Sequence, residues 1–273
     1  MIRTLTCVAG ASLLVSPALG VVNVLEDRNS TTFIEDGAGA GMFGWEVDGT
    51  PNLAFQGFFY RTGGMGFESA VDTSTLALTG SFLVDTNPFV DPRPDTFSAQ
   101  YTGPGFVIEP TWTLRGGMAG SGTSDIAESI AIHNTSNQVL QFTFFQYSDF
   151  DLGGTSGDDS LVLTGTPINT AKQSDPLAGV LNETVVTPSP QRYQVDDFPN
   201  LIIELTDTGI TNLNNNAGPL GPGDMTWAFQ WEFNLLPGQT ALISKDKQLN
   251  IPAPSGAVLL GIAGLLSGRR RRA

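Results

Sequence analysis

The sequence predicts an all-β protein, a single antiparallel β-sandwich of jelly-roll-like type, between two short apolar terminal segments. Short apolar or alternating runs are separated by turn-forming residues, and the chain of 273 residues contains 32 Gly and 17 Pro. Outside its two ends, no stretch shows a capped helical period over about ten residues or more. The chain is 40% hydrophobic and 15% charged, which is typical of a globular protein.

Residues 1–20 have the layout of a secretory signal peptide and are expected to form a signal helix. One positive charge precedes an apolar stretch, residues 5–15, that is too short to span a bilayer. Ala18 and Gly20 place small side chains where signal peptidase requires them, so cleavage is expected after Gly20. Cys7 then leaves with the signal, and the mature protein has no thiol for disulfides, zinc ligation or nucleophilic catalysis.

The body, residues 21–250, is expected to form one β-sandwich domain, because no long linker divides it. Runs rich in β-branched and aromatic residues, bounded by turn residues, mark the strands. The predicted strands are Leu53–Arg61, Leu76–Val84, Phe106–Leu114, Ile126–His133, Val139–Tyr147, Ser160–Leu163, Thr184–Val186, Leu201–Leu205, Thr226–Leu235 and Thr240–Ser244.

Two of these runs also predict which residues face the core. In Thr226–Leu235 the aromatic residues occupy alternate positions, beginning at Trp227, so the odd-numbered residues are expected to face inward. In Val139–Tyr147 apolar residues fall on both faces, which predicts a strand covered on both sides.

A glycine-rich segment after the second of these runs concentrates carboxylates. Asp149, Asp151, Asp158 and Asp159 are separated mainly by glycine, serine and threonine. Calcium takes six to eight oxygen ligands and tolerates irregular loops, so these four residues are candidate calcium ligands. The spacing is not that of an EF-hand, and the alternative is a solvated hairpin whose Asp and Gly residues form the turn. No other cofactor is expected.

Charge and histidine content narrow the remaining chemistry. The chain has 27 acidic and 13 basic residues, a net charge of −14, which argues against nucleic-acid binding. Its one histidine, His133, lies at a strand end, where a hydrogen-bonded turn residue is the expected role. Pairs of acids could serve glycoside hydrolysis, and Trp45, Trp112 and Tyr193 are either sugar-stacking surfaces or core residues.

The C-terminal segment, residues 251–273, has three parts in a fixed order. Pro252, Ala253 and Pro254 hold an extended stretch, an apolar run occupies residues 257–266, and the cluster follows as Arg269, Arg270, Arg271 and Arg272. The expected helix of about 12 residues is roughly 18 Å long, short against a hydrocarbon core of about 30 Å. We therefore expect a transient anchor in the cytoplasmic membrane, with the arginines on the cytoplasmic side.

This layout resembles the PEP-CTERM sorting signal of exported bacterial proteins, which is the substrate tail of exosortase. Ala253 stands where that family has glutamate, so the exosortase subtype stays open. Stretches of the body, residues 58–64, 124–136, 145–152 and 228–231, also resemble an uncharacterised type of exported PEP-CTERM protein, a likeness that implies export and no particular activity.

The function expected from the sequence is that of an exported cell-envelope or extracellular-matrix protein, structural or adhesive, without catalysis. Its expected partners are signal peptidase, exosortase, the cytoplasmic membrane through the tail, and extracellular polysaccharide. The alternative is an exported carbohydrate-binding module or a glycoside hydrolase that uses Asp or Glu.

Overall fold

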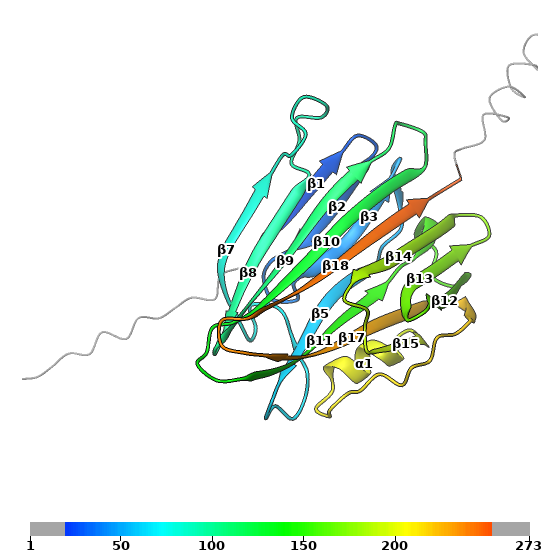
Figure 1. The fold of residues 1–273 in the computed structure, drawn as a ribbon. Helices are drawn as coiled ribbons and strands as arrows, with labels where there is room; N and C mark the ends of the chain where they lie inside the picture. The colour runs from blue at the N-terminus through cyan, green and yellow to red at the C-terminus, as the bar shows by residue number, and fades with distance from the viewer. Residues whose placement is uncertain (1–19, 253–273) are drawn as a thin grey trace, which may run out of the picture.

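Residues 20–252, which the computed structural model describes, form two nine-stranded antiparallel sheets that pack face to face (Figure 1). The prediction of an all-β antiparallel sandwich is confirmed. Strands begin at Val22 and end at Asn250, so they extend through the whole of the predicted body.

The first sheet, called sheet A, contains the N-terminal strands. Its order is β1-β2-β3-β5-β11-β17-β15, with β4 paired to β3 and β6 paired to β5. The strands are β1 (Val22–Asp27), β2 (Ser30–Glu35), β3 (Gly41–Val47), β4 (Thr50–Pro51), β5 (Phe55–Thr62), β6 (Ser69–Ala70), β11 (Leu140–Asp149), β15 (Arg192–Asp197) and β17 (Met225–Leu235).

The second sheet, called sheet B, has the order β16-β12-β13-β14-β18-β10-β9-β8-β7. The long central strands β10 and β18 pair over eleven residues. The strands are β7 (Ala77–Val84), β8 (Thr96–Gly103), β9 (Phe106–Gly116), β10 (Thr123–Asn134), β12 (Asp159–Gly165), β13 (Ile168–Asp175), β14 (Gly179–Thr187), β16 (Leu220–Gly223) and β18 (Thr240–Asn250).

One predicted strand is wrong. Leu201–Leu205 lies in a short helix, α1 (Asn200–Thr206), which covers part of the outer face of sheet A near β15. Leu201 and Leu205 lie one helical turn apart and are fully buried against Phe145 and Tyr147 of β11. A five-residue run with four apolar residues fits a buried helix turn as well as a strand, so the periodicity alone did not distinguish them. A single 3₁₀ turn, η1 (Leu152–Gly154), follows β11.

Aromatic side chains fill the space between the sheets. Trp227, Phe229 and Trp231 of β17 all point into this core, as their alternation predicted. Phe58 of sheet A stacks on Trp112 of sheet B, with ring centroids 5.8 Å apart. Strand β11 is buried on both faces, as predicted, since Phe142 and Phe144 face the core while Phe145 lies beneath α1.

An ionic network also lies between the sheets. Lys245 and Lys247 of β18 form ion pairs with Glu128 of β10, and all three side chains are completely buried. Lys245 also lies 3.7 Å from Glu183 of β14 and contacts Gln146 of β11, which donates to Glu183 at 2.6 Å. Two lysines and two glutamates therefore balance within the core.

Burial and charge act in opposite directions within this network. Burial would raise the pKa of Glu128, but the ammonium groups of Lys245 and Lys247 outweigh it and lower that pKa to about 2. Burial lowers the pKa of Lys245 to about 8, although Glu128 and Glu183 act to raise it. The two glutamates keep Lys245 charged at neutral pH despite complete burial.

Backbone contacts tie both ends of the described chain to the sandwich. The Val21 amide donates to Asp36 Oδ1 at 2.8 Å, and Asp36 is buried. At the other end, the Ile251 amide donates to the Gly122 carbonyl at 2.7 Å. Within residues 20–252, no helix is both long and apolar enough to cross a membrane. The predicted signal helix and apolar tail lie outside these residues.

Candidate functional site

Three carboxylates meet at one end of the sandwich. Asp149 is the last residue of β11, Asp151 precedes η1, and Asp224 lies between β16 and β17. One carboxylate oxygen from each lies within 4.8 Å of the others, and we call this group the carboxylate triad. Two of its members belong to the predicted calcium set, whereas Asp224 comes from a connection far along the chain.

The triad is partly enclosed, and two of its buried carboxylate oxygens have no hydrogen-bond donor. Asp149 is only 6% exposed; its Oδ2 accepts from the Tyr147 hydroxyl at 3.2 Å, but its Oδ1 has no partner. The Oδ1 of Asp151 is also buried without a partner. Burial, together with the charges of Asp224, Asp151 and Asp159, raises the pKa of Asp149 to about 7. Burial and neighbouring carboxylates also raise the pKa of Asp151 and of Asp224.

The other two predicted ligands, Asp158 and Asp159, lie outside this triad. Asp159 begins β12, and its Oδ2 accepts from Gln173 Nε2 at 2.7 Å. Burial raises the pKa of Asp159 to about 7 despite this hydrogen bond, and the charges of Asp175 and Asp158 add to the rise. The chain turns between Asp151 and Asp158, so the four predicted calcium ligands do not form one cluster.

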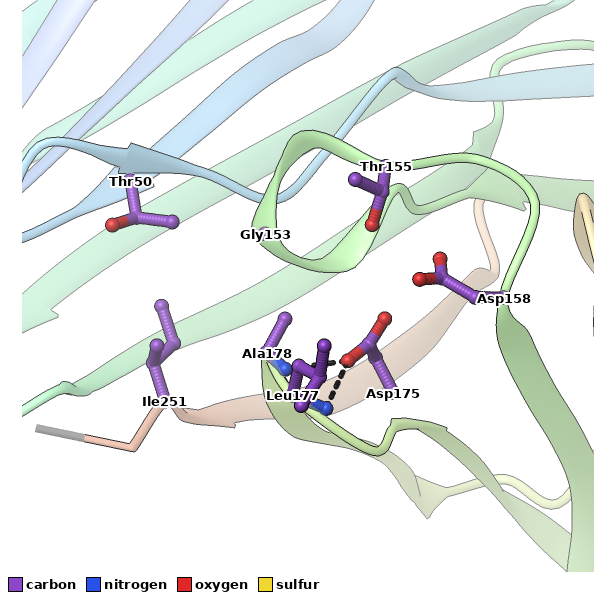
Figure 2. A pocket seen from close by; sticks show the side chains of 8 residues that line it. All are labelled: Thr50, Gly153, Thr155, Asp158, Asp175, Leu177, Ala178 and Ile251. Atoms are coloured by element: carbon purple, nitrogen blue, oxygen red, sulfur yellow. Dashed lines mark hydrogen bonds between the residues drawn. The ribbon is translucent and has the colours of Figure 1, made fainter.

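Asp158 instead lines a cleft of about 330 Å³. Figure 2 shows Asp158 and Asp175 on one side of this cleft and Thr50 and Ile251 on the other. Asp175 stabilises the turn that follows it, because its Oδ1 accepts hydrogen bonds from the backbone amides of Leu177 and Ala178. One carboxylate of the cleft therefore supports the backbone, and the Oδ1 of Asp158 is buried without a partner.

A second group of carboxyls lies on the outer face of sheet B, the face turned away from sheet A. Asp125 of β10 and Asp246 of β18 lie on neighbouring strands, and Asp246 is paired in register with Ala127, two residues from Asp125. Their carboxyls are in hydrogen-bond contact. Burial, followed by the charge of Asp246, raises the pKa of Asp125 to about 6. Asp125 therefore holds its proton to a higher pH than an ordinary aspartate does.

Asp125 opens onto a small cleft of about 150 Å³. Arg115 of β9 and Gln248 of β18 flank Asp125 in the sheet and line the same cleft. Arg115 is held by Asp95, whose Oδ2 accepts from Nη1 at 3.1 Å. Gly117 keeps the cleft open, since a Cβ there would lie 2.3 Å from Thr123 Oγ1. A guanidinium, an amide and a carboxyl group thus line one small cleft.

Sequence reasoning did not single out this pair. The available signal was strand parity: Asp125 alternates with the buried Ile126, and Asp246 alternates with the buried Lys245 and Lys247. This parity places both acids on one outer face. Their proximity required the register between β10 and β18, which the sequence did not supply.

The remaining candidates have mainly structural places. His133 is half-buried near the end of β10, and its Nδ1 lies 2.9 Å from Thr240 Oγ1. Trp45 and Trp112 are buried in the core, and Tyr193 packs against it. None of these three aromatics is an open stacking surface.

The predicted processing residues are mostly outside the described chain. Gly20 and Pro252 lie at its two limits and are exposed. Ala18, Ala253, Pro254 and the arginine cluster lie outside the described residues, so their predicted roles stay predictions.

The fold defines a structural class: two antiparallel sheets packed as a β-sandwich, an arrangement also found in the solved structures below. Neither the comparison with protein-family models nor that with curated proteins gives a match. Among solved structures, a putative aldose 1-epimerase from Escherichia coli K12 has a TM-score of 0.52 at 11% identity, covering 86% of this chain and 99% of that one. A galactose mutarotase-like protein from Lactobacillus casei has a TM-score of 0.52 at 8% identity, covering 84% and 100%.

A larger protein contains the same fold as one part. A bacterial glucoamylase, solved in complex with acarbose, has a TM-score of 0.54 at 9% identity. The match covers 96% of this chain but only 37% of the glucoamylase. At these identities the likeness shows a shared fold.

These comparisons correct one expectation. The sequence led us to expect no catalysis, whereas the solved structures that share the fold include the putative aldose 1-epimerase and the glucoamylase, both named as enzymes.

Proposed function

We propose that this protein is an exported carbohydrate-active protein whose Asp125–Asp246 pair transfers protons on a bound sugar. The observation that carries the proposal is the nearly end-to-end likeness of the sandwich to the epimerase and the mutarotase-like protein. The carboxyl pair and its cleft supply the chemistry on this chain.

The contact between the two carboxyls favours proton transfer over glycoside hydrolysis. Hydrolases hold their carboxyls about 5–5.5 Å or about 6.5–9.5 Å apart, so that a nucleophile or a water fits between them. Groups in direct hydrogen-bond contact leave no such space. Two adjacent carboxyls instead provide one group to accept a proton and one to donate a proton, and the pKa of Asp125, about 6, lies near the working range.

Opening of a cyclic hemiacetal needs these two functions. The ionised carboxyl takes the proton of the anomeric hydroxyl, the bond from the anomeric carbon to the ring oxygen breaks, and the protonated carboxyl gives its proton to that oxygen. Closure on the opposite face reverses each transfer and inverts the anomeric centre. Arg115 and Gln248 are placed to hold the sugar hydroxyls.

Polarimetry tests this proposal directly. The purified protein should accelerate the mutarotation of a freshly dissolved aldose, such as galactose or glucose, above the rate in buffer. Asp125→Asn should lower the acceleration by about 10²–10⁴-fold, the usual contribution of a general acid or base. Asp207→Asn is the control, because Asp207 is exposed in the turn after α1.

A rate equal to that of buffer for every aldose, with no saccharide bound on a glycan array, would contradict the proposal. Glycan binding that survives Asp125→Asn, without turnover, would support the carbohydrate-binding alternative and reject the proton-transfer role.

We also propose, from the terminal residues, that the chain is exported and sorted by exosortase. The support is the residue order of the two ends, with Arg269 to Arg272 following the apolar run. Mass spectrometry of the protein from its native cells should find a chain that begins at Val21 and lacks the arginine cluster. An intact chain in the cytosol would overturn this proposal.

A further inference from the structure

The carboxylate triad has a geometry that suits one cation. Asp149 and Asp151 lie on either side of Phe150, and Asp224 reaches them from the β16–β17 connection. Calcium lies about 2.3–2.6 Å from its oxygen ligands, so two ligands on opposite sides of one ion are up to about 5.2 Å apart. The mutual limit of 4.8 Å in the triad falls inside this span.

An independent observation points to a missing ligand. Asp149 is only 6% exposed, and its Oδ1 has no hydrogen-bond donor. The Oδ1 of Asp151 is buried and unpartnered in the same way. Buried polar atoms are nearly always paired, and leaving a carboxylate oxygen unpaired is costly. One cation bound between them would partner both atoms.

The surrounding charges do not supply that partner. The charges that act on Asp149 come from Asp224, Asp151 and Asp159, which are all carboxylates. Asp197 adds a further negative charge beside Asp224. The ammonium groups of the buried network already pair with Glu128 and are not among these neighbours. A divalent ion would offset this concentrated negative charge.

The ligand set selects the kind of ion. All three groups are carboxylates, which suit hard cations, and zinc prefers nitrogen or sulfur ligands. Magnesium requires distances of about 2.0–2.1 Å, so opposite ligands must come within about 4.2 Å of each other. Calcium accepts any oxygen separation up to the 4.8 Å bound of the triad, and carboxylates that bind through both oxygens can fill several of its six to eight positions.

From this geometry we propose that Asp149, Asp151 and Asp224 bind one calcium ion. The ion joins the end of β11 in sheet A to the connection that leaves β16 of sheet B. It thereby links the two sheets at the end of the sandwich that holds the cleft of Asp158. The site is distinct from the Asp125–Asp246 pair, so either proposal can fail without the other.

Calorimetric titration of the chelator-treated protein with CaCl₂ and with MgCl₂ is the primary test. One calcium ion should bind per chain, more tightly than magnesium. At a calcium concentration about 100-fold above the dissociation constant, the melting temperature should rise by about 5–10 °C. A flat calcium isotherm together with an unchanged melting temperature in chelator would overturn the proposal, whatever the variants do.

Matched variants locate the ion. Asp224→Asn should weaken calcium binding about tenfold or more, because it removes one charged ligand. Asp158→Asn, in the same loop region but outside the triad, should bind as the unmodified protein does. Loss of binding in Asp158→Asn with retention in Asp224→Asn would refute the assignment.

Terbium luminescence gives a readout that does not depend on stability. Terbium replaces calcium at carboxylate sites and emits when a nearby aromatic ring transfers energy to it, and the Tyr147 hydroxyl contacts Asp149. Bound terbium should emit on aromatic excitation and lose this emission when calcium is added. Emission that Asp224→Asn leaves unchanged would place the ion elsewhere and reject the proposed ligands.

Discussion

Replacing Lys245 by methionine should destabilise the sandwich strongly, although methionine is apolar and of similar length. The Lys245 ammonium pairs with Glu128, contacts Gln146 and lies 3.7 Å from Glu183, and every charged group involved is fully buried. In the variant, two buried glutamates would share the single ammonium of Lys247. The fold would then contain one uncompensated negative charge between its sheets.

The expected loss follows from that imbalance. Removing one partner of a buried ion pair costs about 3–5 kcal/mol, because the remaining charge stays desolvated. Methionine fills most of the lysine volume, so a cavity adds little. With a urea slope of about 3 kcal/mol/M, the unfolding midpoint should fall by about 1–1.7 M at pH 7.

A double variant separates charge balance from packing. Glu183→Gln removes the second glutamate charge while its side-chain oxygen can still accept from Gln146. Combined with Lys245→Met, it leaves Glu128 paired with Lys247, and the double variant should be more stable than Lys245→Met alone by about 1–3 kcal/mol. A Lys245→Met midpoint within about 0.3 M of the unmodified protein, or a double variant less stable than the single one, would refute the reasoning.

Two further predictions test other parts of the fold. Leu205→Ala should cost about 2–5 kcal/mol in thermal or urea unfolding, because Leu205 is buried between α1 and sheet A; a loss below about 1 kcal/mol would mean that α1 packs loosely. The raised pKa of Asp125 means that the folded state binds this proton more tightly than the unfolded state, whose pKa is about 3.9. Its contribution is therefore most favourable below about pH 4 and is lost as the pH rises to about 6. Relative to the unmodified protein, Asp125→Asn should gain about 1 kcal/mol between pH 4 and pH 7, a value reduced because the carboxyl is only half-buried. An equal difference at both pH values would rule out the raised pKa.

The sequence predicted the fold class because strand periodicity survives in single segments. The alternation from Trp227 to Trp231 identifies both a strand and its inward face, and the structure buries these residues as expected. The run Leu201–Leu205 gave no such discrimination, since four apolar residues in five without clear alternation fit either a strand or one helical turn. Burial against β11 stabilises the helix, and that contact is invisible to a local pattern.

The same limit applies to the charged interior and the candidate site. Lys245 and Lys247 lie on the same face of β18 as Ile243 and Leu249, because all four positions are odd-numbered. Strand alternation alone therefore places both lysines inside. Lysines usually face solvent, so the alternation was not interpreted as evidence that these two are buried. Asp224 was out of reach for a different reason, because its proximity to Asp149 depends on the pairing of β17 with β11.

The contact between Val21 and Asp36 has a consequence for maturation. In the precursor, a neutral amide donates to the buried carboxylate at 2.8 Å. If the leader is removed after Gly20, as predicted, the same nitrogen becomes an ammonium, and a charge-assisted bond is roughly twice as strong as a neutral one. The trimmed protein would then be held more firmly at its first strand than its precursor, below the α-amino pKa of about 8. The folded state would therefore gain the full stability of this contact only after the leader is cleaved on the far side of the membrane.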